Sequence, residues 1–131
     1  METQAKAIVT DFLNAVQTGN NAQLAALLSQ NIQWDQPGNN LVSGKKNSAA
    51  EVFGMVGKMF ELSENSLRLT DIKSVTVNGK EVACLLQWQA LKPDGTKLNV
   101  ENIDVYTVEN GEIVSAKVFS ADIEAENLFW S

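Results

Sequence analysis

Apolar residues recur every three or four positions in parts of the N-terminal half, a spacing that predicts helices. The first such stretch, 5–16, ends before Gly19, and glycine is favoured immediately after a helix. A short second helix is expected over 24–28. A third should follow Ser48, because Ser48 and Glu51 form a capping-box pattern ahead of an apolar face.

From residue 66 onward the pattern changes to the alternation that is typical of strands. Three glycine-containing segments divide this half, and each supplies the positive φ that a tight reversal needs: Asn78-Gly79, Pro93-Asp94-Gly95 and Asn110-Gly111. The strands are expected over 66–77, 80–92, 96–108 and 112–120. A separate extended segment, 32–35, ends before Pro37.

These elements predict one α+β domain over residues 1–131, long enough to form a single hydrophobic core. Three helices cannot cover both faces of a four-stranded antiparallel sheet. The sheet should therefore curl around the helices into a cone and leave its outer face to water or to a partner. A pocket is then expected on the inner face.

The composition restricts the chemistry of such a pocket. The chain has no histidine, the usual general base and the commonest zinc ligand, so acid–base catalysis would need carboxylates and no metal site is expected. No glycine motif that cradles phosphate is present, and no cofactor is expected. A net charge of −6 with scattered lysines argues against nucleic-acid binding. With no apolar run of membrane-spanning length and no secretory signal pattern, we expect a cytoplasmic protein.

Three segments, together with the order of the predicted elements, carry a family resemblance. They are Thr18-Gly19-Asn20, the stretch 34–38 with an Asp-Pro turn containing one inserted residue, and 102–106 leading into Asn110-Gly111. They resemble the nuclear transport factor 2-like superfamily, in particular its SnoaL-like polyketide cyclase and ketosteroid isomerase branch. The resemblance implies a cystatin-like α+β roll, and a pocket for a small hydrophobic or polyketide- or steroid-like organic molecule.

The resemblance also implies catalytic roles for Asp35 and Asp104. In the steroid isomerases of this superfamily, the acid at the position of Asp35 moves a proton between carbons. The acid at the position of Asp104 stays protonated and donates a hydrogen bond to the enolate oxygen. A tyrosine that donates to the same oxygen falls on Phe12, which has no hydroxyl. Losing one such donor typically costs about 2.7 to 4 kcal/mol of transition-state stabilisation, which disfavours steroid isomerisation and leaves SnoaL-type cyclisation open.

The residue pattern leaves other roles open for both acids. Asp104 lies in mid-strand, where a carboxylate is unusual, but it could be exposed or paired with a lysine. A two-residue turn at Asn110-Gly111 would place it opposite Lys117, whereas a three-residue loop with a bulge would place it opposite Ala116. The second arrangement is favoured because it groups the acid with apolar residues. Asp35 could equally make a local turn contact.

Pairing across the turn after Pro93 predicts that Leu85 lies opposite Asp104 and Gln87 opposite Asn102. Amides would then lie beside the acid on the pocket wall, although a one-residue shift would bring Leu86 there instead. The residues expected to bind the ligand are Phe12, Phe53, Phe60, Gln87, Asn102, Tyr106, Ala116 and Val118.

The same register predicts an apolar outer face and hence a homodimer through the sheet. Its members would be Val82, Cys84, Leu86, Trp88, Ile103 and Val105. The aromatic C-terminal segment 128–130 is expected to pack structurally, and Cys84 to be a buried, inert thiol.

Two functional hypotheses follow. The first is a SnoaL-like small-molecule-binding protein, an isomerase or cyclase that moves a proton next to a carbonyl, with Asp35 as base and Asp104 as neutral donor. The alternative is a non-catalytic ligand carrier or protein-interaction domain, which a cavity filled by the protein's own side chains would indicate. Epoxide hydration would need an arginine between two acids, and the position of Arg68 does not suit it.

Overall fold

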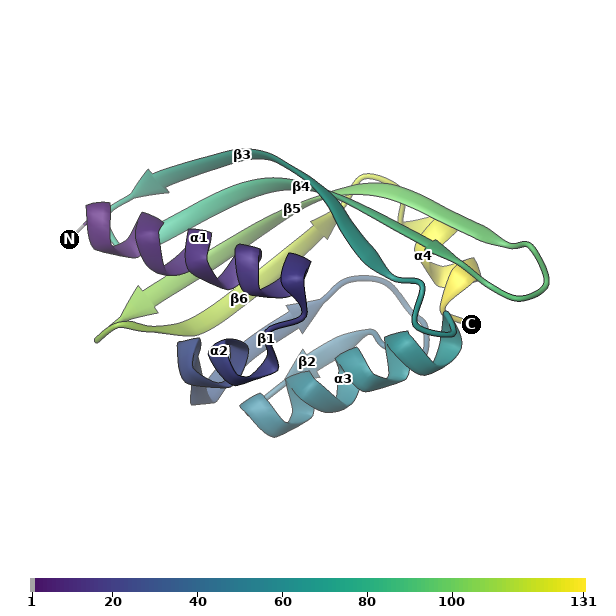
Figure 1. Cartoon of the computed structure of the whole chain (residues 1–131), viewed down its shortest axis with the longest axis horizontal. Coiled ribbons are helices and arrows are strands. Elements are labelled where there is room, and N and C mark those ends of the chain that lie inside the picture. Colours follow the sequence, from purple (N-terminus) through teal and green to yellow (C-terminus); the bar gives the residue numbers. More distant parts are fainter. Residues whose placement is uncertain (1) are drawn as a thin grey trace.

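Helices α1, α2 and α3 pack against one face of a six-stranded sheet in the computed structural model, which describes residues 2–131 (Figure 1). The helices span Glu2–Thr18 (α1), Asn21–Leu27 (α2), Ala49–Leu62 (α3) and Ile123–Phe129 (α4). The strands span Leu28–Gln36 (β1), Gly44–Lys46 (β2), Arg68–Asn78 (β3), Glu81–Leu91 (β4), Lys97–Glu109 (β5) and Glu112–Ser120 (β6). This is the expected α+β architecture, with β2 and α4 as elements that the pattern did not predict. None of the described helices is long and apolar enough to cross a membrane.

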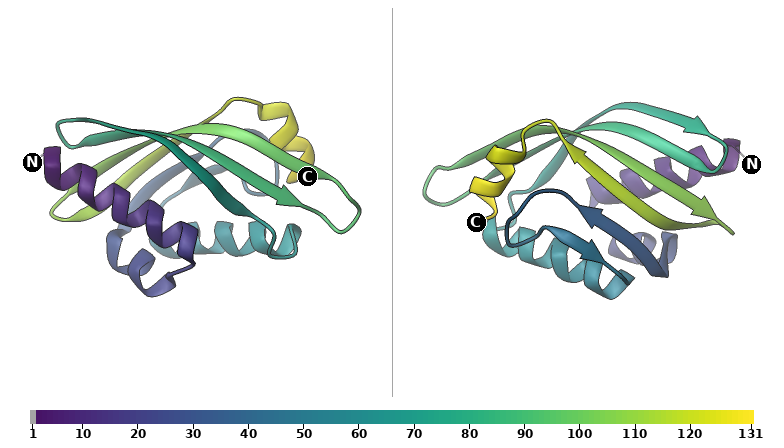
Figure 2. Two further views of the ribbon diagram at one scale, coloured as in Figure 1. Left: turned by 45° about the horizontal axis from the view of Figure 1, so that its top comes forward. Right: turned by 180° about the vertical axis from the view of Figure 1, so that it is seen from behind.

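The strands are arranged in the order β2-β1-β6-β5-β4-β3, and the sheet curves around the helices (Figure 2). Strands β3 to β6 form the predicted antiparallel meander. Strand β1, however, pairs in parallel with β6, so the sheet is mixed and not wholly antiparallel. A parallel neighbour is possible because the long connection through α3 and the meander separates the two strands in sequence.

The helix ends carry the caps that the sequence predicts. Ser48 accepts a hydrogen bond from the backbone N–H of Glu51 at 3.1 Å. The Glu51 carboxylate accepts from the N–H of Asn47 at 2.7 Å, one residue before the expected donor. Gly19 follows α1 with a φ of +70°, a conformation that costs glycine little. Local side-chain chemistry therefore fixes where these helices begin and end.

Helix α4 closes one end of the molecule. Asp122 caps it by accepting from the N–H of Ala125 at 3.0 Å. Phe129 and Trp130 are buried as expected, whereas Leu128 is 71% exposed and does not pack. The helix lies beside the loop between β1 and β2, where the Leu41 N–H donates to the Trp130 carbonyl at 3.1 Å (Figure 2).

The hairpin between β5 and β6 differs from both expected forms. Its turn has two residues, Asn110 and Gly111, but β6 contains an irregularity one pair further along, between Ile113 and Ser115. The extra residue shifts the register by one position, so that Asp104 lies opposite Val118 and opposite neither Lys117 nor Ala116. The acid still shares an apolar inner face with Ala116 and Val118, as predicted.

The predicted register between β4 and β5 is wrong by one residue. Asp104 lies opposite Cys84, and Asn102 opposite Leu86. The turn is longer than expected because Pro93 has no N–H, and it is Lys92 that donates to the Thr96 carbonyl, at 2.8 Å.

A one-residue shift exchanges the two faces of β4. Val82, Cys84 and Leu86 are buried on the inner face, and the prediction that they form an outer patch is wrong. Gln87 turns to the outer face, where it lies opposite Glu101 and donates to Asn99 at 2.7 Å.

Candidate functional site

A cavity of about 560 Å³ lies between the helices and the inner face of the sheet. Its volume falls within the range of about 300 to 1,000 Å³ that is usual for small-molecule pockets. The wall is mainly aliphatic and aromatic, and all three tryptophans of the chain, Trp34, Trp88 and Trp130, contribute to it. The protein's own side chains therefore do not fill this space.

Three polar side chains line up along the inner face of β5. Asn102, Asp104 and Tyr106 alternate with outward-facing residues, and all three are buried. The Tyr106 hydroxyl donates to Asp104 Oδ2 at 2.6 Å. Within residues 2–131, Asp104 Oδ1 and Asn102 Oδ1 have no hydrogen-bond partner. Buried polar atoms are nearly always paired, so these two oxygens indicate a place for an external polar group.

The pKa of Asp104 is raised from 3.8 to about 7: burial raises it most, the hydrogen bond from Tyr106 lowers it in part, and the charge of the Glu126 carboxylate raises it. The side chain is only 3% exposed, which explains why desolvation is the largest cause. Near neutral pH the acid is therefore protonated in a large share of the molecules. In that form Asp104 can donate a hydrogen bond into the cavity while still accepting one from Tyr106.

Neighbouring groups respond to the same environment. Burial, with the Asp104 charge beside it, raises the pKa of the Cys84 thiol to about 12. Burial and Asp104 also hold the pKa of Tyr106 well above its usual value. Cys84 is thus a buried thiol, as predicted, and both groups stay neutral around the acid.

Asp35 does not share this site. Strand β1 turns Trp34 and Gln36 toward the cavity, where the indole N–H donates to Gln36 Oε1 at 2.9 Å. Asp35 lies on the other face of the strand, at the level of Lys45 on β2 and Lys117 on β6. The residue inserted before Pro37 is Gln36, and it occupies the inward position. The expectation that Asp35 faces the pocket is therefore wrong.

The other expected ligand-binding residues divide into three groups. Ala116 is buried opposite Tyr106, and Gln87 lies on the outer face. The remaining six line the cavity: Phe12, Phe53, Phe60, Asn102, Tyr106 and Val118. The Phe12 ring packs edge-on against Tyr106 with centroids 5.5 Å apart, and the Tyr106 hydroxyl donates to Asp104.

The cavity also contains residues that the sequence pattern did not identify, namely Trp34, Gln36, Glu126 and Trp130. Glu126 and Trp130 belong to α4 and its C-cap. The signal that could have identified them was Asp122, a favourable N-cap residue, four positions before Glu126.

No three carboxylate or thiol groups within residues 2–131 gather as metal ligands would. Arg68 lies at the cavity wall near the start of β3, where it donates to the carbonyls of Asn65 and Leu67, both at 2.8 Å. Its strand position is level with Asn99 on β5, five residues from Asp104. Arg68 therefore does not lie between two acids, the arrangement that epoxide hydration would need.

Comparisons with known proteins agree with this architecture. The model of the SnoaL-like domain matches residues 9–116. A protein of unknown function with a cystatin-like fold from Xanthomonas campestris is 32% identical, with a TM-score of 0.92 over 97% of this chain and 98% of that chain. An NTF2-like protein from Burkholderia xenovorans LB400 is 16% identical, with a TM-score of 0.83 over 100% and 98%. TerC, co-crystallised with polyporic acid, is 11% identical, with a TM-score of 0.83 over 98% and 99%. The comparison with curated proteins gives no match.

Proposed function

The chain belongs to the SnoaL-like family of nuclear transport factor 2-like proteins, and from this premise we propose that its cavity binds a small, largely apolar organic molecule. One observation carries the proposal: a cavity of about 560 Å³ with apolar walls contains a buried acid whose Oδ1 has no partner among the described residues. A domain that used this fold only to interact with proteins would have no need for that combination. The ligand-carrier hypothesis requires the cavity, and the enzyme hypothesis requires both the cavity and the acid.

The polar end of the cavity favours a ligand that carries a carbonyl or hydroxyl oxygen. Protonated Asp104 offers a hydrogen-bond donor, and the side chain of Asn102 offers a second polar contact two residues away on the same face of β5. The aromatic walls suit a ring system. Polyporic acid, found with TerC, is a reasonable first probe of such a pocket.

The same arrangement supports proton transfer next to a carbonyl. When a proton leaves the neighbouring carbon, negative charge develops on the carbonyl oxygen, and a neutral buried acid is a preorganised donor for that charge. Asp104 has the burial and the raised pKa that this role needs. We therefore infer a cofactor-independent isomerase or cyclase as the enzymatic form of this function.

Polyporic acid should quench the tryptophan fluorescence of the protein in a saturable manner, because all three tryptophans line the cavity. Val56, a half-buried cavity residue on α3, offers a place to fill the space. Overpacking costs about 1 to 3 kcal/mol, so Val56→Phe should weaken binding by about tenfold or more. Gln87→Ala on the outer face is the control. Equal quenching of the wild type and Val56→Phe would place the probe outside the cavity.

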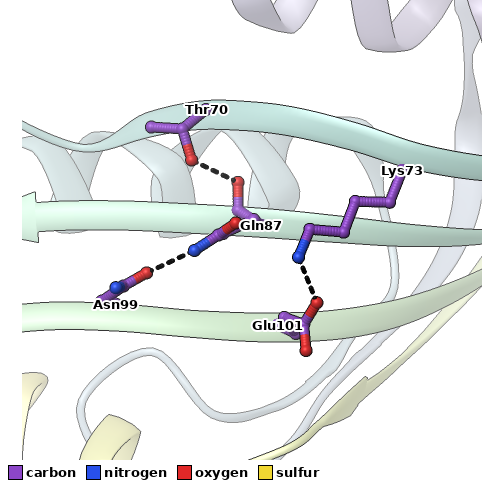
Figure 3. Close-up of polar contacts among 5 residues, drawn as sticks. All are labelled: Thr70, Lys73, Gln87, Asn99 and Glu101. Carbon is purple, nitrogen blue, oxygen red and sulfur yellow. Dashed lines mark hydrogen bonds and ion pairs between the residues drawn. The ribbon is translucent and has the colours of Figure 1, made fainter.

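We also propose that the outer face of the sheet joins two copies of this chain. Ile103 and Phe119 lie opposite each other on β5 and β6, and they are 47% and 48% exposed. Polar groups border them, because Lys73 on β3 pairs at 2.6 Å with Glu101, which lies two residues before Ile103 on β5 (Figure 3). Lys117 lies 5.5 Å from the Phe119 ring. A two-fold axis through such a face can set cations of one copy opposite anions of the other.

Sedimentation at micromolar concentration should give twice the monomer mass of 14.3 kDa. Ile103→Lys should shift the protein to the monomer, since the substitution places a charge in the middle of the apolar contact. Leu41→Lys, at an exposed leucine in the loop after β1, should leave the mass unchanged. A monomer mass for the wild type would rule out the dimer.

A further inference from the structure

Glu126 is a second buried carboxyl in the same cavity, supplied by α4. It is 5% exposed, and within residues 2–131 its Oε2 has no hydrogen-bond partner. The backbone around it is well anchored: its N–H donates to the Asp122 carbonyl at 3.2 Å, and its carbonyl accepts from Trp130 at 2.9 Å. An acid held in this way, with a free oxygen, is costly to bury and calls for a functional explanation.

Asp104 and Glu126 are the two carboxyls among the described residues that line the cavity, and they come from different elements. Asp104 projects from the middle of β5. Glu126 comes from α4, beyond the Ser120 end of β6, and Ser120 lies opposite Asn102. A ligand that reaches the polar end of the cavity therefore meets both acids.

We propose that Glu126 is the base of this pocket, which removes a proton from carbon while Asp104, in its protonated form, donates to the oxygen that gains the charge. The assignment rests on the proposed function, because it requires that an organic molecule enter the cavity. It gives the substrate class as molecules with an acidic C–H near an oxygen that can accept negative charge. The base thus comes from α4 and has the catalytic role that was expected for Asp35 on β1.

The surroundings of the two acids favour this division of roles. Burial raises the pKa of both, and the charge of Glu126 opposes ionisation of Asp104, so the pair tends to hold one proton. The hydroxyl of Ser120 lowers the pKa of Glu126 and so favours its ionised form. For Asp104, Tyr106 occupies Oδ2 and leaves Oδ1 as the atom that can carry the proton.

The other charged or titratable groups around the pair are few. Asp122 at the start of α4 raises the pKa of Glu126 by its negative charge. Tyr106 and Cys84 surround Asp104 on β5 and β4. Lys92 lies over the Phe129 ring of α4, with Nζ 4.8 Å from its centroid, and Arg68 lies at the cavity wall.

The probe for this base is 5-nitrobenzisoxazole, a small aromatic molecule that needs one proton transfer to react. The Glu126 carboxylate removes the proton from the ring carbon, and the C–H electron pair becomes part of the carbon–nitrogen triple bond of a nitrile. The N–O bond breaks, and its electron pair stays on the phenolate oxygen, which accepts a hydrogen bond from Asp104. The product, 2-cyano-4-nitrophenolate, is followed by its absorbance. No oxidant or cofactor is needed.

After subtraction of the buffer rate, the wild-type rate between pH 5 and 9 should be bell-shaped, rising as the base ionises and falling as the acid loses its proton. Glu126→Gln should lower the rate by about 100-fold, the usual contribution of a general base. Asp104→Asn should remove the falling limb, and Glu126→Asp should retain the rising one. Glu124→Gln is the matched control, since Glu124 lies exposed on the same helix.

Polyporic acid quenching, measured on the same samples, separates the two proposals. Suppose that polyporic acid quenches the fluorescence, but Glu126→Gln reacts at the wild-type rate or the wild type does not react faster than buffer. Either result overturns the role of Glu126 and leaves the proposed binding function intact. If Asp104→Asn loses the reaction and Glu126→Gln keeps it, the base is Asp104, and the proposal is overturned as well. Absence of both quenching and reaction in the wild type overturns the proposed function itself.

Discussion

Asp104→Asn should become progressively more stable than the wild type as the pH rises from 4 to 8, by about 4 kcal/mol over this range. The folded protein raises the pKa of Asp104 from 3.8 to about 7, so the folded state holds this proton more tightly than the unfolded state does. The stability that proton binding contributes is fully present below about pH 4 and is lost as the pH rises through 7. Each pKa unit is equivalent to 1.36 kcal/mol. Asparagine has no proton to lose.

Urea denaturation of both proteins at pH 4, 6 and 8 measures this difference. Asp94→Asn serves as a control, because hydrogen bonds with Thr96 hold the pKa of Asp94 below its usual value. The stability that ionised Asp94 contributes is gained as the pH rises toward 4 and is nearly complete above it, so Asp94→Asn should differ from the wild type by an almost constant amount between pH 4 and 8. A free-energy difference between Asp104→Asn and the wild type that did not change with pH would show that Asp104 is not the buried acid of the folded state.

Phe129→Ala should lower the free energy of unfolding by about 3 to 5 kcal/mol, the usual cost of truncating a buried aromatic side chain. Phe129 is 1% exposed and packs edge-on against Trp130, with ring centroids 4.7 Å apart. The loss should extend beyond α4, because Asn127 accepts from the backbone N–H of Asn39 at 2.7 Å and so ties the loop after β1 to this helix. The cavity wall at Trp130 should loosen at the same time.

Leu128→Ala provides the matched comparison, one residue away on the same helix. The Leu128 side chain is mostly exposed, so its removal should change stability by no more than about 0.5 kcal/mol. Urea denaturation followed by tryptophan fluorescence measures both variants. Similar small losses for the two would mean that α4 is not docked as described.

The helices and the meander could be predicted because their signals are local. The spacing of apolar residues, the Ser48 cap and the glycine turns each depend on a few neighbouring residues, and the structure confirms them. Strand β2 was missed because three residues are too few to show a period, and helix α4 because its buried residues, Glu126 and Phe129, do not form a repeating apolar face. The parallel pairing of β1 with β6 leaves no trace in either strand's own sequence.

The registers failed because each depends on the count of residues in a turn or bulge. Pro93 cannot donate a hydrogen bond, which lengthened one turn, and the irregularity in β6 between Ile113 and Ser115 moved the partner of Asp104. One residue is enough to turn Gln87 from the inner face to the outer face. Alternation within β5 was unaffected by these shifts, so Asn102, Asp104 and Tyr106 share one face as expected, and of the two placements left open for Asp104 the favoured inward one is observed.

The second acid of the site could not be predicted. The inserted Gln36 occupies the inward position and turns Asp35 to the outer face. The insertion is visible in the sequence, but its effect on the direction of Asp35 was not predicted. Glu126 depends on the docking of α4 against the sheet, and long-range packing of this kind is not encoded by any local pattern. Its role as a base, and that of Asp104 as a donor, stay predictions.

The single thiol of the chain can measure how often the sheet opens. Cys84 is buried beside Asp104, and its pKa is raised to about 12. An alkylating reagent needs both access to the sulfur and a thiolate, and the folded protein offers neither. The rate of labelling under native conditions therefore counts excursions in which β4 separates from the helices. A ligand bound in the cavity would lower the rate of Cys84 labelling. This rate can therefore report whether the cavity is occupied, even when the reaction is not known.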